Sequence, residues 1–482
     1  MEPSAELCVV FLAVLLASVI LPMYSVDETN FLTARSALIK SENCARLGSN
    51  VKLDTNEKMV SSFLLMEKQK VINAARLNRS IYMPAASFFL SKRWMQNTPV
   101  FKIISKMPKG AALHIHELAL TSLDWLISNL TYRDNAYMCK AKHGYLKFAV
   151  FSTLSRNPDC AWKSVKQERT ASGNAALFNE RLKKNLSLLA TDPLKTFETP
   201  SDAQRRLEIY QDQVENLIRR PTVLTDYLTQ AIKEFQADNV LYMEVRARLT
   251  GMIDEHGEPV SPEGVLEMYE NVGYEIVNKF RNFSGLRIIH TSPRYSTPAE
   301  VLREVQLAMK LRGDYSDILV GFDLDGFENP GQSLSYYLDA LLFPTRSKQD
   351  LSLPYFFHAS ENLWFGTDAD ENIVDAVMLN VSRIGHAYSL PKYAKTMDII
   401  KDKMIGIEVN PISNQVMGLV QDLRNHAIIP VLTVDTPILI SSDYPAAWEA
   451  LPLSHDLYVS FMALSSKNSG LRYLKEMITH SI

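Results

Sequence analysis

The sequence predicts an α/β protein whose main domain is a (β/α)8 TIM barrel, with an N-terminal helical domain and an inserted disulfide-bonded lobe. Two observations predict the barrel. Eight short apolar runs, separated by helical stretches, occupy the last three-quarters of the chain, and each run ends in a turn. Several of these runs end on His, Asp or Glu. The active site of such a barrel lies at the carboxyl ends of its strands, so these residues are the candidates for chemistry.

The first 25 residues are interpreted as a secretory signal peptide, which predicts a secreted, extracellular protein. Leu7 to Leu21 is almost entirely apolar, and it is shorter than the roughly 20 residues that a bilayer span needs. A signal anchor or a buried N-terminal helix is the alternative, because the segment before Leu7 is acidic rather than basic. No other stretch is apolar enough to cross a membrane. The net charge of −3 gives no reason to expect a nucleic-acid partner.

Five Asn-x-Ser/Thr sequons are compatible with secretion and predict glycosylation sites. They begin at Asn78, Asn129, Asn185, Asn282 and Asn380.

Residues 26–105 are predicted to form a helical N-terminal domain. Met59–Ala75 has apolar residues at helical spacing, and Pro84 and Pro99 interrupt the segments that follow. Nothing in this region resembles a site, so a packing or dimerisation element is the simplest interpretation.

The barrel is expected over residues 106–482, with an insertion at about 127–190 that has weak periodicity. Cys139 and Cys160 lie inside the insertion and would form a disulfide in an oxidising compartment, although two unpaired thiols are the alternative. From Thr131 to Ser187 there are eleven Lys/Arg and four Asp/Glu, a net charge of +7. Such a basic lobe could bind an acidic surface, such as a glycosaminoglycan or a receptor, or could simply be a solvated face.

The alternation of apolar runs with helical stretches favours a parallel sheet with crossover helices. The predicted helices include Glu263–Phe280, Pro298–Leu311, Glu371–Leu379 and Asn414–Arg424. The predicted strands are Ala112–His116, Val240–Arg246, Leu286–Thr291, Ile318–Leu324, Tyr355–His358, Arg383–His386, Ile405–Asn410 and Ile438–Ser442.

Four of the strand-end residues suit a metal. His114 and His116 lie two apart on the first run, so their imidazoles point to the same face. The pair alone could be structural, but His358 ends the fifth run and Asp443 follows the eighth. Three neutral imidazoles and one carboxylate leave a position open for water, as a catalytic zinc requires. We therefore expect one Zn²⁺ per chain at these four residues.

Two further residues could transfer protons. Glu361 lies three residues after His358 and is expected to protonate a nitrogen of the substrate. His386 ends the sixth run and is expected to orient the zinc-bound water and take its proton. Either residue alone could belong to an ordinary salt bridge or a buried core, but six such residues at strand ends favour a catalytic site. The chain has no Gly-x-Ser-x-Gly elbow, phosphate-binding glycine loop or Cys-x-x-Cys signature of cytidine-type deaminases.

Several segments resemble the secreted adenosine deaminase-related growth factor family over almost the whole chain. The matching segments are Met107–His116, Leu241–Arg248, Pro354–Ala359, Pro411–Val416 and Ser441–Asp443. The resemblance implies a zinc barrel that hydrolyses adenosine, an N-terminal dimerisation domain that makes the protein a homodimer, and a receptor-binding lobe. It also implies the zinc ligands given above, with Glu361 protonating N1 of the purine and His386 serving the hydroxide. Gly326 would offer its backbone to the purine.

The chain departs from the family pattern at four expected substrate contacts. Tyr444 replaces an Asp that holds the purine N7, and Glu117 replaces the Asp that meets the ribose. Phe327 stands in place of a His, and Gln204 begins a helix motif that starts with Trp in the family. Each lost hydrogen bond to a buried substrate atom costs about 1–3 kcal/mol.

Three hypotheses remain open from the sequence. The first is an extracellular zinc-dependent adenosine deaminase, weakened or shifted in specificity. The second is a zinc-stabilised growth factor-like ligand with little catalysis. The third is a barrel hydrolase acting on another amine or amide.

Overall fold

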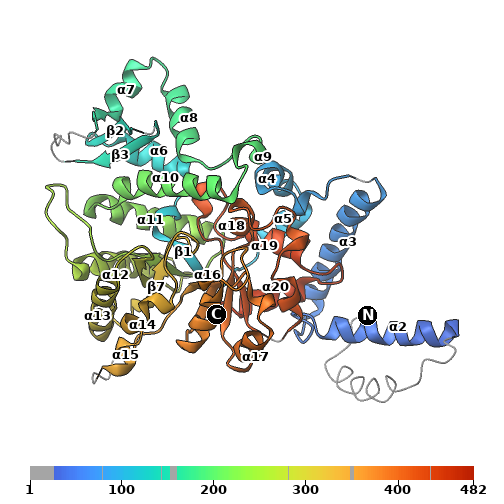
Figure 1. Ribbon diagram of the computed structural model, residues 1–482. Helices are drawn as coiled ribbons and strands as arrows, with labels where there is room; N and C mark the ends of the chain where they lie inside the picture. The colour runs from blue at the N-terminus through green and yellow to red at the C-terminus, as the bar shows by residue number, and fades with distance from the viewer. Residues whose placement is uncertain are drawn as a thin grey trace.

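The computed structural model describes residues 27–78, 80–142, 144–151, 160–280, 282–347, 352–434 and 436–482 (Figure 1). The predicted signal peptide lies outside these residues. Its outcome is therefore left as a prediction, as is the start of the N-terminal domain at residue 26.

Eight parallel strands form the barrel in two four-stranded sheets, ordered β1-β5-β6-β7 and β11-β10-β9-β8. Bridges between Ile115 and Asp443 and between Phe322 and Tyr355 join the two sheets at both seams. The predicted (β/α)8 barrel is confirmed. The strands are β1 (Ala111–His116), β5 (Tyr242–Ala247), β6 (Gly285–Pro293), β7 (Leu319–Asp325), β8 (His358–Ala359), β9 (Arg383–His386), β10 (Gly406–Val409) and β11 (Ile438–Ile440).

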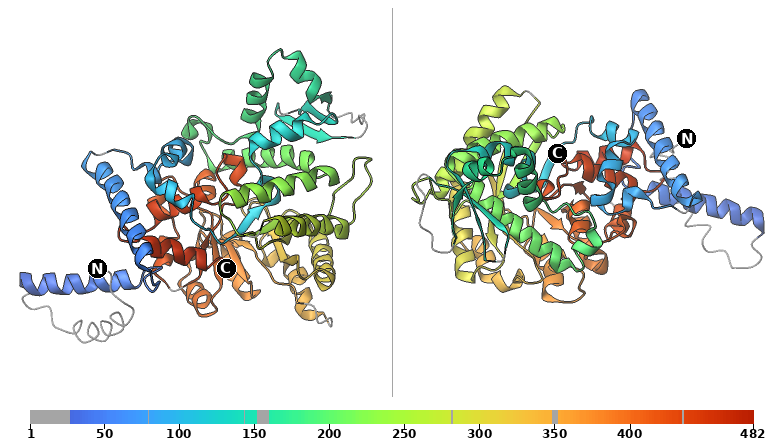
Figure 2. Two further views of the ribbon diagram at one scale, coloured as in Figure 1. Left: turned by 180° about the vertical axis from the view of Figure 1, so that it is seen from behind. Right: turned by 90° about the horizontal axis from the view of Figure 1, so that it is seen from above.

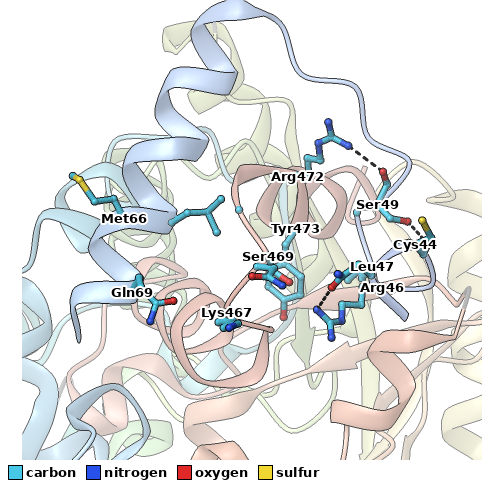
Figure 3. A pocket seen from close by; sticks show the side chains of 15 residues that line it. Cys44, Arg46, Leu47, Ser49, Met66, Gln69, Lys467, Ser469, Arg472 and Tyr473 are labelled. Atoms are coloured by element: carbon cyan, nitrogen blue, oxygen red, sulfur yellow. Dashed lines mark hydrogen bonds between the residues drawn. The ribbon is translucent and has the colours of Figure 1, made fainter. Parts of the chain in front are cut away.

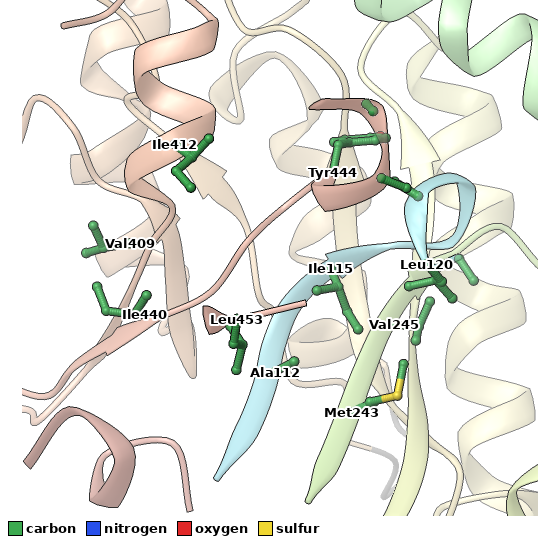
Figure 4. Packing of buried hydrophobic residues seen from close by; sticks show 14 of the residues in the cluster. Ala112, Ile115, Leu120, Met243, Val245, Val409, Ile412, Ile440, Tyr444 and Leu453 are labelled. Carbon is green, nitrogen blue, oxygen red and sulfur yellow. The ribbon is translucent and has the colours of Figure 1, made fainter. Parts of the chain in front are cut away.

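Both faces of these strands are buried, which explains why the runs are continuously apolar. All six residues of β1 are buried. Figure 4 shows Ala112 and Ile115 of β1 beside Met243 and Val245 of β5, within the main hydrophobic cluster. The polar residues that end these strands are therefore held by a rigid apolar scaffold.

Crossover helices cover the outside of the barrel. Their starts carry ordinary capping signals: α13 begins at Pro298, and Thr297 and Glu300 form a capping box there. Three of the predicted helices are found within a few residues, as α12 (Pro262–Lys279), α13 (Pro298–Asp314) and α16 (Asp368–Met378). The helices α11 (Pro221–Ala237) and α17 (Ala394–Asp402) also lie in this region.

One predicted helix, Asn414–Arg424, is wrong. The observed helix α18 (Pro411–Val416) ends early. Gly418 follows with a φ of 78°, a left-handed conformation that ends helices and favours glycine. A β-carbon there would also lie 3.2 Å from the Pro200 ring.

The N-terminal region is helical, as expected, and comprises α2 (Glu28–Cys44), α3 (Thr55–Leu77), α4 (Phe88–Gln96) and α5 (Pro99–Ile104). Helix α2 extends away from the body in Figures 1 and 2, and none of its residues is buried. Helix α3 packs against α20 (Leu471–Thr479) near the end of the chain. Buried Lys68 of α3 donates to the carbonyls of Phe461, at 2.6 Å, and Ser466, at 2.8 Å, which precede α20 in the chain.

The insertion forms a small lobe at the top of Figure 1. Its antiparallel sheet has the order β3-β2-β4, with β2 at Ala136–Lys140, β3 at Leu146–Val150 and β4 at Lys163–Ser164. Helices α7 (Val165–Ala171) and α8 (Ala175–Leu186) complete it. Cys139 and Cys160 form a disulfide with a Cα–Cα distance of 5.9 Å, which confirms the predicted bridge. Among the described residues, no helix is long and apolar enough to span a bilayer.

Candidate metal centre and active site

The four predicted ligands converge at the carboxyl ends of β1, β8 and β11. One side-chain ligand atom from each of His114, His116, His358 and Asp443 lies within 4.8 Å of the others, and all four residues are buried. The Asp443 Oδ1 atom is 3.1 Å from His116 Nε2 and 3.7 Å from His114 Nε2. The backbone holds this geometry, because Asp443 N–H donates to the His114 carbonyl at 3.0 Å.

Each imidazole has a carboxylate at its other nitrogen. Nδ1 of His114 is 2.7 Å from Glu408 Oε2, and Nδ1 of His358 is 2.7 Å from Asp323 Oδ2. Nδ1 of His116 is 3.4 Å from Asp325 Oδ2. Carboxylate partners of this kind fix the ring orientation and the tautomer, and they leave Nε2 with a lone pair for a metal.

The donor set fits a cation of the zinc class. The Nε2 atoms of His114 and His116 are buried without a hydrogen-bond partner, an unfavourable state unless an ion is bound. Three imidazoles and one carboxylate match the nitrogen and oxygen ligands of a catalytic metal with one open position.

Arg246 on β5 organises the carboxylates that hold two of these rings. Its Nε donates to Asp323 Oδ2 at 2.8 Å and its Nη2 donates to Glu408 Oε2 at 2.7 Å. All three side chains are completely buried. The guanidinium therefore balances two buried negative charges, and one rigid group connects the partners of His114 and His358.

The backbone around the site is strained. Ser360, His386 and Asp443 have φ values of 62°, 62° and 61°, which non-glycine residues rarely adopt. Gly385 is required, since a β-carbon there would lie 2.8 Å from Cε1 of His114. Strain of this kind persists only where the surrounding structure holds it, and it gathers at functional sites.

Glu361 and His386 lie beside the four ligands. The Glu361 Oε1 atom is 3.2 Å from His386 Nδ1. Burial, together with the charges of Asp443 and Glu328, raises the pKa of Glu361 well above its usual value and so favours the protonated acid. Burial lowers the pKa of His386 to about 3, so the ring is neutral. A neutral acid and a neutral imidazole at one site suit a proton-transfer reaction.

A cavity of about 230 Å³ opens onto these groups. Glu361, His386, His358 and Asp443 are among the residues that line it. Helix α10 (Pro200–Ile218) and the loops after β6 and β7 line the rest of the cavity, with Leu207, Glu208, Gln211, Tyr295, Gly326 and Phe327. A larger cavity of about 530 Å³ is lined by residues of α3 and α20 and by the segment after α2, and Figure 3 shows Arg46, Lys467 and Arg472 around it.

Tyr444 forms a wall of the cavity. Its ring stacks on His116 with centroids 4.3 Å apart, and its hydroxyl accepts a 2.7 Å hydrogen bond from Gln211. Burial raises the pKa of the phenol well above 10, so it keeps its proton. A second cavity of about 140 Å³ lies beyond, and Tyr444 and Gln211 line both cavities.

Of the other expected substrate contacts, some line the two cavities and one does not. Gly326, with a φ of 113°, lines both cavities, and Phe327 lines the larger of the two. Glu117 lines the smaller one, where Arg219 binds its carboxylate at 2.9 Å. Gln204 is not among the residues that line either cavity; Leu207 and Gln211, further along the same helix, occupy the rim.

Comparison with known proteins assigns this arrangement to a family. The chain matches the adenosine deaminase family over residues 181–476 and the adenosine/AMP deaminase N-terminal family over residues 10–104. It belongs to the adenosine deaminase family. Residues 105–180, which hold the His-x-His strand and most of the lobe, lie between the two matched regions.

Members of this family with similar sequences are found in vertebrates and insects. The chain is 36% identical to human adenosine deaminase 2 over 460 residues, which cover 95% of this chain and 88% of the relative. It is 35% identical to an adenosine deaminase of Phlebotomus duboscqi over 460 residues, which cover 95% and 87%. The family resemblance expected from the motifs is therefore confirmed.

Solved structures support the fold. An Arabidopsis N6-mAMP deaminase superimposes with a TM-score of 0.53 at 17% identity, covering 79% of this chain and 94% of that one. An amidohydrolase from Burkholderia ambifaria with bound Zn gives a TM-score of 0.54 at 17% identity, covering 79% and 86%.

Sequence reasoning about this family member missed the groups behind the ligands. Asp323 lies in the predicted strand Ile318–Leu324 and Asp325 directly follows it, but neither residue was given a role from the sequence. Arg246 lies inside the resembling segment Leu241–Arg248. Glu408 gave no signal, because a single acid in the apolar strand β10 resembles many others. The rim residues Leu207 and Gln211 were missed because only helix geometry places them over the cavity.

Proposed function

We propose that this protein is a zinc-dependent adenosine deaminase that hydrolyses adenosine to inosine and ammonia. The observation that carries the proposal is the meeting of the His114, His116, His358 and Asp443 ligand atoms with Glu361 and His386 in one cavity. Membership of the adenosine deaminase family supports adenosine as the substrate.

The reaction joins the oxygen of water to C6 of the purine and breaks the bond from C6 to the amino nitrogen. A zinc ion at the four ligands would act as a Lewis acid and lower the pKa of water to about 7. Protonated Glu361 would give its proton to N1 of the ring as C6 becomes tetrahedral. Neutral His386 would orient the attacking water through a hydrogen bond. The proton that the water loses would go to the amino nitrogen, which leaves C6 as ammonia.

An inosine-formation assay on metal-analysed protein tests this proposal. Glu361→Gln should lower turnover by about 10²–10⁴-fold while zinc stays bound, because an amide has no proton to give. Glu371→Gln is the matched control, since Glu371 is exposed on α16 and should behave like the wild type. A Glu361→Gln variant with more than half of wild-type activity would exclude the proposed acid.

Metal analysis tests the ligand assignment separately. Wild-type protein should hold about one equivalent of zinc. His358→Ala should lose the zinc, because the three remaining ligands do not bind it tightly enough. Equal metal content in the two proteins would contradict the assignment.

A second candidate function follows from Tyr444. Its ring stands between the two cavities, and its hydroxyl is already bonded to Gln211. Because Tyr444 separates the two cavities, the site is compatible with a growth factor-like ligand that binds zinc but has little turnover. Stoichiometric zinc without inosine formation would favour this second function.

We also propose that the protein is secreted and glycosylated. The apolar segment Leu7–Leu21 and the sequons support this assignment, as does the Cys139–Cys160 disulfide, which oxidising compartments favour. Expression in cultured animal cells should place glycosidase-sensitive protein in the medium. Retention of unglycosylated protein inside the cells would contradict it.

The N-terminal helices are proposed to form a homodimer interface. Phe31 and Leu38 of α2 are 54% and 53% exposed, and Met59 of α3 is 61% exposed. A single protomer gains nothing by exposing these side chains, and a second copy would cover them. Phe31→Asp with Leu38→Asp should convert a dimer to a monomer in light scattering. A wild-type monomer at micromolar concentration would refute the interface.

The basic lobe is proposed to contact an acidic partner, either a sulfated glycosaminoglycan or a cell-surface receptor. Several of its cations are well exposed, including Lys163 and Lys166, with 63% and 66% of their side chains accessible. Binding to heparin-coated resin should weaken when both are changed to Glu, and it should fall with salt. Unchanged retention would exclude these residues as contacts.

A further inference from the structure

A chain of buried hydrogen bonds runs from a backbone amide to His386. Ile428 N–H donates to His426 Nδ1 at 3.1 Å. His426 Nε2 lies 3.0 Å from Asn414 Oδ1, and Asn414 Nδ2 lies 3.0 Å from His386 Nδ1. His426, Asn414 and His386 are 2%, 0% and 1% exposed, so water cannot replace these partners.

The backbone amide fixes the direction of every bond in the chain. An amide N–H can only donate, so His426 Nδ1 must accept and its ring proton must sit on Nε2. That N–H needs an acceptor, which orients the Asn414 side chain with its oxygen toward His426. The Asn414 amino group then faces His386 and must donate to Nδ1. A neutral His386 ring is left with its proton on Nε2.

The opposite arrangement is excluded by its own contacts. A proton on His386 Nδ1 could also face Glu361 Oε1, 3.2 Å away, but it would still oppose the Asn414 amino group at 3.0 Å. That arrangement requires the Asn414 oxygen to face His386 and the amino group to face His426. His426 would then carry its proton on Nδ1, pointing at the Ile428 N–H only 3.1 Å away. Two donors cannot share that position. Burial also lowers the pKa of His426 to about 3, so a doubly protonated ring does not resolve the conflict.

We propose that His426 is a positioning residue for the active site: acting through Asn414, it holds His386 in the Nε2–H tautomer. His426 does not line the cavity, whereas His386 does, so its effect passes through Asn414 alone. In this tautomer His386 can donate a hydrogen bond from Nε2, while its Nδ1 lone pair accepts the hydrogen bond from Asn414. The kinetic part of this inference rests on the proposed deaminase function, but the tautomer does not.

Nitrogen-15 NMR of metal-loaded protein with labelled histidines tests the tautomer directly. The His386 spectrum should show a protonated Nε2 and an unprotonated Nδ1. Asn414→Asp should invert the pattern, because a carboxylate of the same shape can only accept and so draws the proton to Nδ1. His426→Phe keeps the ring shape but removes both hydrogen bonds, so the two tautomers should become mixed.

Kinetics give a second readout. In Asn414→Asp and in His426→Phe, kcat should fall by about 10–1,000-fold, whereas KM should stay within about twofold and the zinc content should be unchanged. His426→Gln can still donate to Asn414 and should recover most of the loss. Tyr388→Phe is the matched control, because Tyr388 packs on the His426 ring, with centroids 5.1 Å apart, without joining the chain.

Two results would overturn the inference. One is a wild-type His386 with its proton on Nδ1. The other is a His426→Phe protein with a wild-type tautomer and a kcat within twofold of wild type. Absence of turnover in the wild type would refute the proposed function instead, and the NMR result would still decide the tautomer.

Discussion

Arg246→Lys should weaken metal binding without touching a metal ligand. The guanidinium of Arg246 donates to Asp323 and Glu408, and also to the carbonyls of Leu113 and Phe356, both at 3.0 Å. Nε and Nη2 of the planar guanidinium each bind a different carboxylate. A lysine ammonium carries its charge on one nitrogen and cannot occupy both positions. One of the two buried ion pairs of Arg246 would therefore be lost.

The magnitude follows from what is left unpaired. Breaking a buried ion pair by removing one partner costs about 3–5 kcal/mol of stability. Carboxylates that orient metal-binding histidines are worth about 10–100-fold in metal affinity. Because Arg246 serves the partners of both His114 and His358, we expect the upper end of this range, about 100-fold, equivalent to about 2.7 kcal/mol.

Zinc affinity should be measured by competition with a chromophoric chelator, and stability by urea unfolding of the apo and metal-loaded forms. Arg383→Lys is the matched control, because Arg383 donates to the other oxygen of Glu408 at 2.6 Å and to Glu244, and so serves only one of the two carboxylates that Arg246 serves. It should lose less affinity than Arg246→Lys. Wild-type zinc affinity in a folded Arg246→Lys protein would show that Asp323 and Glu408 do not need this cation.

Three further outcomes are expected. Tyr444→Asp should raise inosine formation at least tenfold, since a carboxylic acid can reach N7 of the purine. The variant should lose about 3 kcal/mol of stability, because the stack of Tyr444 on His116 is lost. A folded, zinc-loaded variant without any gain in activity would argue against the purine contact. Asn185→Gln should leave the glycosylated mass of secreted protein unchanged, because Asn185 Oδ1 accepts a 2.7 Å bond from Gln213, whereas Asn380→Gln should reduce it; the reverse pattern in mass spectrometry would contradict this assignment. Replacing Cys139 and Cys160 by Ser should destabilise the lobe by about 3 kcal/mol, given their separation of 21 residues, and speed its proteolysis; unchanged cleavage rates would refute the contribution.

The sequence by itself determined the barrel and the four residues that gather as a candidate metal site. Strands buried on both faces must be continuously apolar, so eight such runs with intervening helices left few other folds. His114, His116, His358 and Asp443 stood out because polar residues at the ends of apolar strands are unusual. In a parallel barrel, all strands end on the same face, so their convergence followed from topology alone.

Only the tertiary structure decided what surrounds those ligands. Arg246, Glu408 and His426 act through contacts between residues more than ten positions apart, and single charged or polar residues in apolar segments carry no pairing information. The end of helix α18 depended on the left-handed backbone at Gly418, which helical periodicity does not reveal. The rim residue Gln211 was fixed by how α10 lies across the cavity, a packing choice made between elements far apart in the chain.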